Sequence, residues 1–124
     1  MRKKLLLFAA VGALFSQNPG IQRTVVHRED VTIPGREAVI ARVELAPQAR
    51  AGRHTHPGEE ISVILEGELT LEVDGQPARV VKAGEALFVP ARTIHAGKNA
   101  GKGKAVVLAT YVVEKGQPVA TPVK

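Results

Sequence analysis

The sequence contains no cysteine and no tryptophan, and it is poor in aromatic residues. Its 124 residues include three phenylalanines and one tyrosine, and Phe8 and Phe15 lie near the N-terminus. Without cysteine the chain forms no disulfide, carries no lipid on a thiol and offers no thiolate to a metal ion. Because only Phe88 and Tyr111 remain, the chain also lacks the aromatic platforms on which nucleic-acid bases stack.

The chain has little net charge once its first residues are set aside. The formal charge is +5, and removing Arg2, Lys3 and Lys4 leaves 14 basic against 12 acidic residues, a net charge of +2. A nucleic-acid-binding domain carries a clustered excess of basic residues. We therefore expect no nucleic-acid partner.

The N-terminus predicts export. The basic run Arg2-Lys3-Lys4 is followed by eleven apolar or small residues, Leu5 to Phe15. This stretch is too short to cross a bilayer as a helix but is typical of a signal-peptide core. We expect residues 1–16 to be a signal peptide and the mature protein to be periplasmic or secreted, without membrane contact. Cleavage after Ala13, an uncleaved anchor and an amphiphilic tail stay open as alternatives.

The remaining sequence predicts an all-β domain of short strands. Residues 38–46 alternate apolar and polar, which indicates a half-buried strand with four inward residues. These are Val39, Ala41, Val43 and Leu45. The continuous apolar run Ile61 to Leu65 indicates a buried strand. Asp74-Gly75 predicts a two-residue hairpin turn, because both positions tolerate positive φ.

No segment after the leader has a helical period, and Gly, Pro and Asp punctuate the chain. This pattern indicates a sandwich or barrel. We expect an N-terminal strand and connection over 17–37, with the strand itself at an edge over residues 21–27. The β-barrel follows over 38–113, and a C-terminal tail over 114–124.

The residues with most chemical significance lie between positions 52 and 67. His54 and His56 are two residues apart, so a strand would direct both imidazoles to one face. Pro57 and Gly58 allow a bend, after which Glu60 can return its carboxylate toward the two rings. Two nitrogen donors and one oxygen donor that converge in this way suit a divalent first-row transition metal.

Two separated patterns in this chain resemble the motifs of the cupin superfamily. The first is His-x-His, three residues, Glu, six residues, Gly, and it is filled by His54, His56, Glu60 and Gly67. The second is Gly, five residues, Pro-x-Gly, two residues, His, three residues, Asn, and it is filled by Gly84, Pro90, His95 and Asn99. One position departs, because Arg92 stands where the superfamily usually has glycine.

The resemblance implies a double-stranded β-helix, or jelly-roll, that holds one divalent metal. The implied ligands are His54, His56, Glu60 and His95, with Asn99 more suited to securing a loop. Four ligands leave coordination positions open, as in catalytic rather than closed structural sites. Iron, manganese, nickel, zinc and copper all remain candidates, because the donor set alone does not select among them.

The function is expected to be that of an exported metal-dependent enzyme, dioxygenase-like, although isomerase and lyase chemistry also lie within the superfamily's range. The shortage of aromatic residues favours a small aliphatic or anionic ligand. Arg92 is the candidate substrate-binding residue, since a guanidinium near the barrel mouth can pair with a carboxylate. A non-catalytic binding module and a metal-stabilised structural cupin are the alternatives. Family habit also suggests a homodimer.

Overall fold

The computed structural model describes residues 18–124, which form ten strands and no helix. The strands are β1 Ile21–Asp30, β2 Arg36–Leu45, β3 Arg50–Thr55, β4 Gly58–Glu66, β5 Glu68–Val73, β6 Arg79–Lys82, β7 Ala86–Val89, β8 His95–Lys98, β9 Ala105–Glu114 and β10 Thr121–Pro122. The predicted signal peptide, residues 1–16, lies outside the described residues. Within residues 18–124 there is no helix that could span a membrane.

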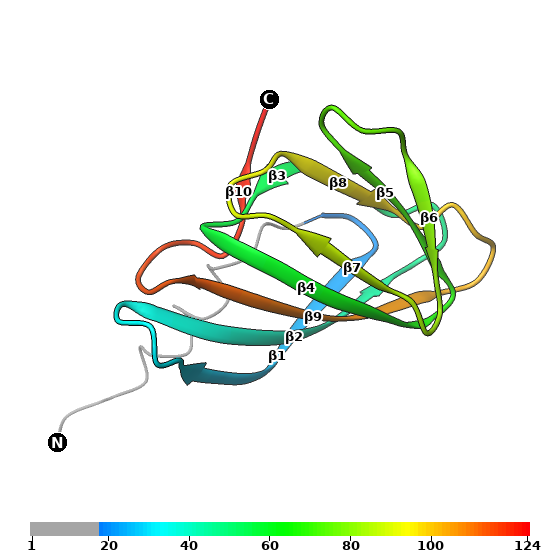
Figure 1. Cartoon of the computed structure of the whole chain (residues 1–124). Helices are drawn as coiled ribbons and strands as arrows, with labels where there is room; N and C mark the ends of the chain where they lie inside the picture. The colour runs from blue at the N-terminus through cyan, green and yellow to red at the C-terminus, as the bar shows by residue number, and fades with distance from the viewer. Residues whose placement is uncertain (1–17) are drawn as a thin grey trace, which may run out of the picture.

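The strands form two five-stranded antiparallel sheets that face each other as a jelly-roll (Figure 1). The first, here called the β9 sheet, has the order β1-β2-β9-β4-β7. The second, the β8 sheet, has the order β10-β3-β8-β5-β6. The prediction of an all-β jelly-roll is confirmed.

The core lies between the two sheets and follows the alternation seen in the sequence. On β2 the four predicted inward residues are all buried, so the predicted strand and its inner face are both correct. The other core residues come from the neighbouring strand β9 of the same sheet and from the β8 sheet, which faces it. They include Val107, Ala109, Val113, Leu69, Leu71 and Val81. Burial of these aliphatic side chains is the main stabilising contribution to the fold.

The apolar run Ile61 to Leu65 is buried on one face only, which corrects the prediction of a buried strand. Ile61, Val63 and Leu65 are 47%, 38% and 51% exposed, whereas Ser62 and Ile64 point into the core. The reason is that β4 belongs to an antiparallel sheet with one free face. Ile61 pairs there with Phe88 of β7, which is also exposed.

The predicted hairpin at Asp74-Gly75 is a turn but has a longer connection than two residues. Gly75 has a φ of 84°, and the Gln76 amide donates to the Val73 carbonyl at 2.9 Å. The return strand, β6, begins only at Arg79. Pro77 lies in the connection and has no amide hydrogen to donate to a ladder, which explains the delay.

Both ends of the described chain join the sheets. Strand β1 forms the expected edge and runs to Asp30, three residues beyond the expected end. In the predicted tail, β10 pairs with β3 and Val119 is only 1% exposed. Both segments thus pair within one chain, and the homodimer stays a prediction.

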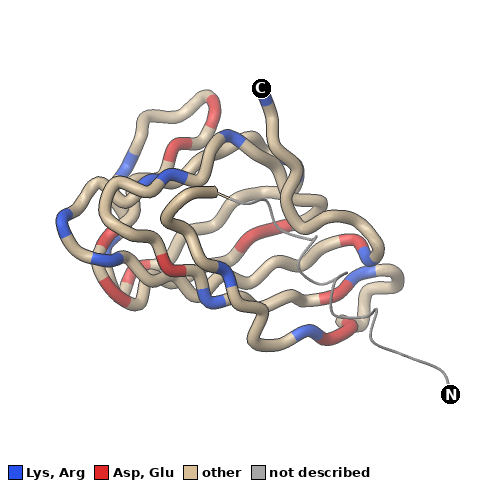
Figure 2. The backbone as a smooth tube through the Cα atoms, turned by 180° about the vertical axis from the view of Figure 1, so that it is seen from behind, with Lys and Arg blue, Asp and Glu red and all other residues tan. Residues whose placement is uncertain are grey.

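Charges of both signs are interspersed along the backbone (Figure 2). Many of them pair, including Arg50 with Glu72 at 2.6 Å and Lys115 with Asp30 at 2.8 Å. Exposed pairs of this kind contribute little to stability. The small excess of basic residues is therefore spread over several strands and is not concentrated on one element.

Candidate metal centre

Three histidines meet at one end of the space between the sheets. His54 lies on β3 and pairs in register with His95 at the start of β8, while His56 follows β3 directly. The ring centroids of His54 lie 4.8 Å from His56 and 4.2 Å from His95. One ligand atom from each ring lies within 4.8 Å of the others. The predicted imidazole pair therefore forms, and the second motif adds the third ring.

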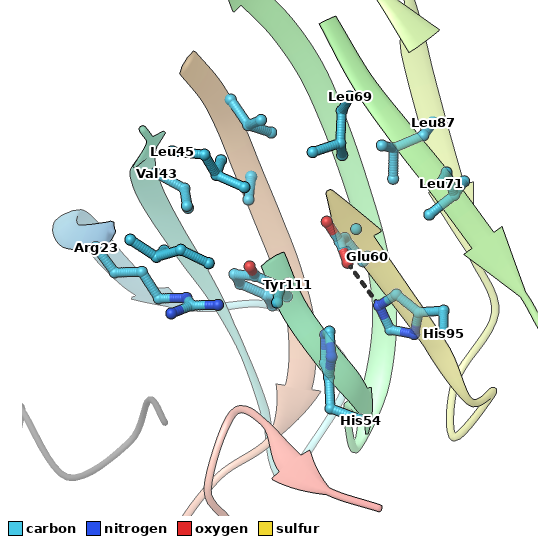
Figure 3. A pocket seen from close by; sticks show the side chains of 15 residues that line it. Arg23, Val43, Leu45, His54, Glu60, Leu69, Leu71, Leu87, His95 and Tyr111 are labelled. Atoms are coloured by element: carbon cyan, nitrogen blue, oxygen red, sulfur yellow. Dashed lines mark hydrogen bonds and ion pairs between the residues drawn. The ribbon is translucent and has the colours of Figure 1, made fainter. Parts of the chain in front are cut away.

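Glu60 approaches this cluster from the opposite sheet. It lies on the inner face of β4, and its Oε1 is 3.1 Å from His56 Nε2 and 3.3 Å from His95 Nε2. The Ser62 hydroxyl donates to Glu60 Oε2 at 2.7 Å and so fixes the carboxylate. Figure 3 shows the Glu60 side chain directed at His95. All four predicted ligands are thus brought together.

Each histidine ring is oriented by a backbone carbonyl. His54 Nδ1 lies 2.6 Å from the Gly52 carbonyl oxygen, and His95 Nδ1 lies 2.9 Å from that of Thr93. His56 Nδ1 lies 2.7 Å from the carbonyl oxygen of Val119. A carbonyl only accepts, so each Nδ1 carries the proton and donates it. This leaves Nε2 of each ring available to a metal, which is how carbonyl partners commonly orient metal-binding histidines.

His56 Nε2 and the Glu60 carboxylate face each other in a way that suits a bound cation. With the proton on Nδ1, His56 Nε2 is an acceptor that faces the Glu60 carboxylate, which also only accepts. Within residues 18–124, His56 Nε2 is a buried nitrogen without a hydrogen-bond partner. The 3.1 Å approach to Glu60 is close but does not have hydrogen-bond geometry. A buried polar atom without a partner lowers the stability of the fold. A divalent ion between His56 Nε2 and the Glu60 carboxylate would bind both acceptors.

The pKa shifts of His54 and Glu60 favour the forms that bind a metal. Burial, helped by the neighbouring His95, lowers the pKa of His54 to about 4, so this ring is neutral at physiological pH. Burial alone would raise the pKa of Glu60. Hydrogen bonds with His95 and Ser62 act in the opposite direction, and the pKa of Glu60 lies well below its usual range. A neutral imidazole and an ionised carboxylate are the forms that bind a metal.

The pKa of His95 shifts in the opposite direction to that of His54. Burial lowers its pKa, but the Glu60 carboxylate and the Thr93 carbonyl raise it more, and the net shift is upward. A hydrogen bond from His95 Nε2 to Glu60 requires a proton on both ring nitrogens, because Nδ1 already donates to Thr93. A metal bound at His95 Nε2 would replace that second proton.

Acid is expected to destabilise the metal-free protein through His54. The folded pKa of about 4 lies below the unfolded value of 6.5. The contribution of His54 is therefore fully present above the unfolded pKa and is lost as the pH falls toward 4. Urea unfolding of chelator-treated wild type and His54→Gln at several pH values between about 7 and 4 measures this. The wild type should lose more free energy of unfolding than the variant, and identical losses would contradict the assignment.

Three residues of the cluster, His54, Glu60 and His95, line a small cavity. The cavity has a volume of about 60 Å³, room for a few water molecules. Its walls are mainly aliphatic, and its polar lining consists of His54, Glu60, His95, Arg23 and Tyr111. Roles for Arg23, Tyr111 and the Val119 carbonyl were not predicted from the sequence. An arginine at an inward position of an alternating strand is the signal that could have identified Arg23.

Two further residues of the second motif occupy different surroundings. Asn99 is buried and secures a loop: its Nδ2 donates to the carbonyls of Leu45 and Gly103 at 3.0 and 2.8 Å. Arg92 has a φ of 62°, a conformation that glycine adopts most easily, which explains the usual glycine there. Its side chain is 62% exposed, pairs with Glu114 at 2.6 Å and is not part of the cavity lining. A substrate role for Arg92 stays a prediction.

Comparisons with known proteins agree with this geometry. Germin-like protein 1 of Brassica napus is 33% identical over 76 residues, covering 57% of this chain and 37% of the relative. Oxalate oxidase 2 of Hordeum vulgare is 32% identical over 78 residues, covering 56% and 35%. The chain thus spans about a third of the length of these two curated relatives.

A solved structure and a family model extend the match. The structure of an oxalate oxidase in complex with the substrate analogue glycolate superposes with a TM-score of 0.67 at 25% identity. The superposition covers 97% of this chain and 68% of that one. The cupin-domain family model matches residues 41–118, which include all four candidate ligands. The chain therefore belongs to the cupin family, and its histidine cluster marks it as a metal-binding member.

Proposed function

We propose that this cupin is a metal-dependent enzyme, dioxygenase-like, that acts on a small, non-aromatic, anionic molecule. The observation that carries the proposal is the convergence of three histidines and the Glu60 carboxylate, of which His54, Glu60 and His95 line a cavity. His54, His56, Glu60 and His95 would hold a divalent ion and leave coordination positions for a substrate. When bound, such an ion supplies Lewis-acid or oxygen-dependent redox chemistry.

The cavity supports a small substrate. A volume of about 60 Å³ accommodates a few heavy atoms and excludes a fused aromatic ring system. The aliphatic lining, with Leu69, Leu71 and Leu87 on one side, limits water around the cluster and strengthens electrostatic interactions there. Some relatives are named for oxalate, a small dicarboxylate, which also favours an anionic substrate.

The small cavity also favours a second candidate, a non-catalytic module that binds a metal or a small ligand. Turnover separates the two. Chelator-treated protein is loaded in turn with iron, manganese, nickel, zinc or copper, and oxygen uptake and substrate loss are followed with a panel of small carboxylates.

An enzyme should consume oxygen with at least one redox-active metal, about tenfold or more above the His95→Ala variant, and not with zinc. Absence of oxygen uptake and of substrate loss with every metal would contradict the enzyme and leave the binding module. A metal-stabilised structural cupin would show neither turnover nor ligand binding.

We also propose that the protein acts after export to the periplasm or the exterior, a proposal that rests on residues 1–16. N-terminal sequencing of the protein from the exported fraction tests it. A mature N-terminus between positions 14 and 17 is expected, and an intact Met1 in the cytoplasm would contradict export.

A further inference from the structure

Arg23 is a charged residue on the inner face of an edge strand. On β1, Ile21, Arg23 and Val25 are partly buried, whereas the intervening Gln22 and Thr24 are exposed. Arg23 pairs in register with Val43 of β2, whose side chain belongs to the core. The alternation of the strand thus places a guanidinium inside the jelly-roll, where an aliphatic side chain would otherwise pack.

The Arg23 side chain lines the cavity that contains the metal cluster. Figure 3 shows its guanidinium directed from β1 toward Tyr111, across the cavity from His95. Its charge interacts with Glu60: burial lowers the pKa of Arg23, and Tyr111 and Glu60 act to raise it. Arg23 is therefore electrostatically coupled to the carboxylate of the cluster.

Arg23 also lies where the cavity meets the surface. A second hollow, lined by Asn18, Gly52, Arg53, Ala120 and Pro122, shares two residues with the inner cavity. The shared residues are Arg23 and His54. Arg23 therefore lies between this hollow and the inner cavity, beside His54.

The charge balance of the cavity favours an anion. Apart from the histidines, its charged lining residues are Arg23, which is positive, and Glu60, which is negative. They cancel, so a divalent ion, as in the proposed function, leaves the cavity with two uncompensated positive charges. Uncompensated charge in an apolar surrounding is costly. A carboxylate brings the compensating negative charge.

We propose that Arg23 is a specificity residue that pairs with the carboxylate of a small carboxylic acid, whose other polar end reaches the metal cluster. A guanidinium suits this role because its planar fork donates two parallel hydrogen bonds to a carboxylate. The inference deepens the proposed function by assigning the substrate class to one residue. It differs from the hypothesis that Arg92 binds the substrate at the barrel mouth, because Arg23 lines the cavity and Arg92 does not.

Calorimetric titration with glycolate and with ethylene glycol, its neutral analogue, tests the inference. The full chain is loaded with zinc, which is not redox-active, and the Arg23→Gln, Arg23→Lys and Arg42→Gln variants are compared. Arg42 is the matched control: it lies on the neighbouring strand β2, is partly exposed and pairs with Glu44.

Wild type and Arg42→Gln should bind glycolate at least about tenfold more tightly than ethylene glycol, because hydrogen bonds to charged groups are worth at least that factor. Arg23→Gln should lose about tenfold or more of the glycolate affinity, and Arg23→Lys should lose less. Equal glycolate affinities of Arg23→Gln and Arg42→Gln, or no preference for glycolate in wild type, would overturn the inference.

The zinc content of each protein distinguishes a failure of metal binding from a failure of the Arg23 inference. If wild type retains no zinc, the same titration of the metal-free chain still decides the role of Arg23, and loading with the other four metals decides the proposed function. If Arg23→Gln alone loses zinc, Arg23 supports the cluster and does not recognise the ligand, which also overturns the inference.

Discussion

Replacing Gly58 with alanine is expected to lower the free energy of unfolding by about 3 kcal/mol or more. Gly58 begins β4 and pairs in register with Val113 of the central strand β9. A Cβ at this position would lie 1.8 Å from the Val112 carbonyl oxygen and 2.7 Å from the Val113 Cα. Both are backbone atoms, so the clash is relieved only if β4 and β9 separate. Urea unfolding measures the loss.

Gly52→Ala is the matched control. Gly52 lies on β3, four residues before His56, and a Cβ there would meet nothing within 4 Å. This variant should remain within about 0.5 kcal/mol of wild type. A Gly58→Ala protein as stable as Gly52→Ala would show that β4 and β9 are not packed as closely as described. Because Glu60 lies two residues beyond Gly58, the metal site should fail together with the strand.

The second large effect is the loss of metal-induced stabilisation in His56→Ala. A ligand at about 100 times its Kd adds about 2.7 kcal/mol to the free energy of unfolding. In a domain of this size that corresponds to a rise in Tm of about 10 °C or more. His56 supplies the Nε2 that faces Glu60, so its removal should reduce the shift below about 2 °C. Thermal unfolding with and without metal measures the shift.

The comparison is made within each protein because His56 also contributes to the metal-free fold. Its ring packs on Tyr111 with centroids 4.6 Å apart, and it contacts the Val119 carbonyl. The control is His27→Ala, since His27 is exposed on β1 and lies 2.9 Å from Glu29. His27→Ala should keep the full shift. An undiminished shift in His56→Ala would contradict the assignment of this ring.

Sequence patterns predicted the features that depend on local period. The alternation of β2 follows from the two-residue repeat of a strand, and the same repeat places the rings of His54 and His56 together. The apolar run Ile61 to Leu65 was ambiguous, because a run without alternation does not show which face is covered. The pairing of Ile61 with the exposed Phe88 on a free sheet face decides that question, and only the structure shows it.

The remaining parts of the site depend on pairings between distant segments. Val119 reaches His56 because the last strand, β10, pairs with β3 at the edge of the β8 sheet. Arg23 enters the cavity because β1 pairs with β2 and turns Ile21, Arg23 and Val25 inward. Neither contact follows from spacing along the sequence. The Glu60 approach was predictable from its motif, but its support by Ser62 was not.

Elemental analysis of the chain, purified without a chelator or a histidine tag, tests the metal centre most directly. One histidine cluster with a single carboxylate should hold about one metal ion per chain, and His56→Ala should hold almost none. The identity of the ion then directs the search for a reaction: iron or copper toward oxygen chemistry, zinc toward hydrolytic or lyase chemistry. A wild-type chain that holds no metal after reconstitution with each candidate ion would contradict the account.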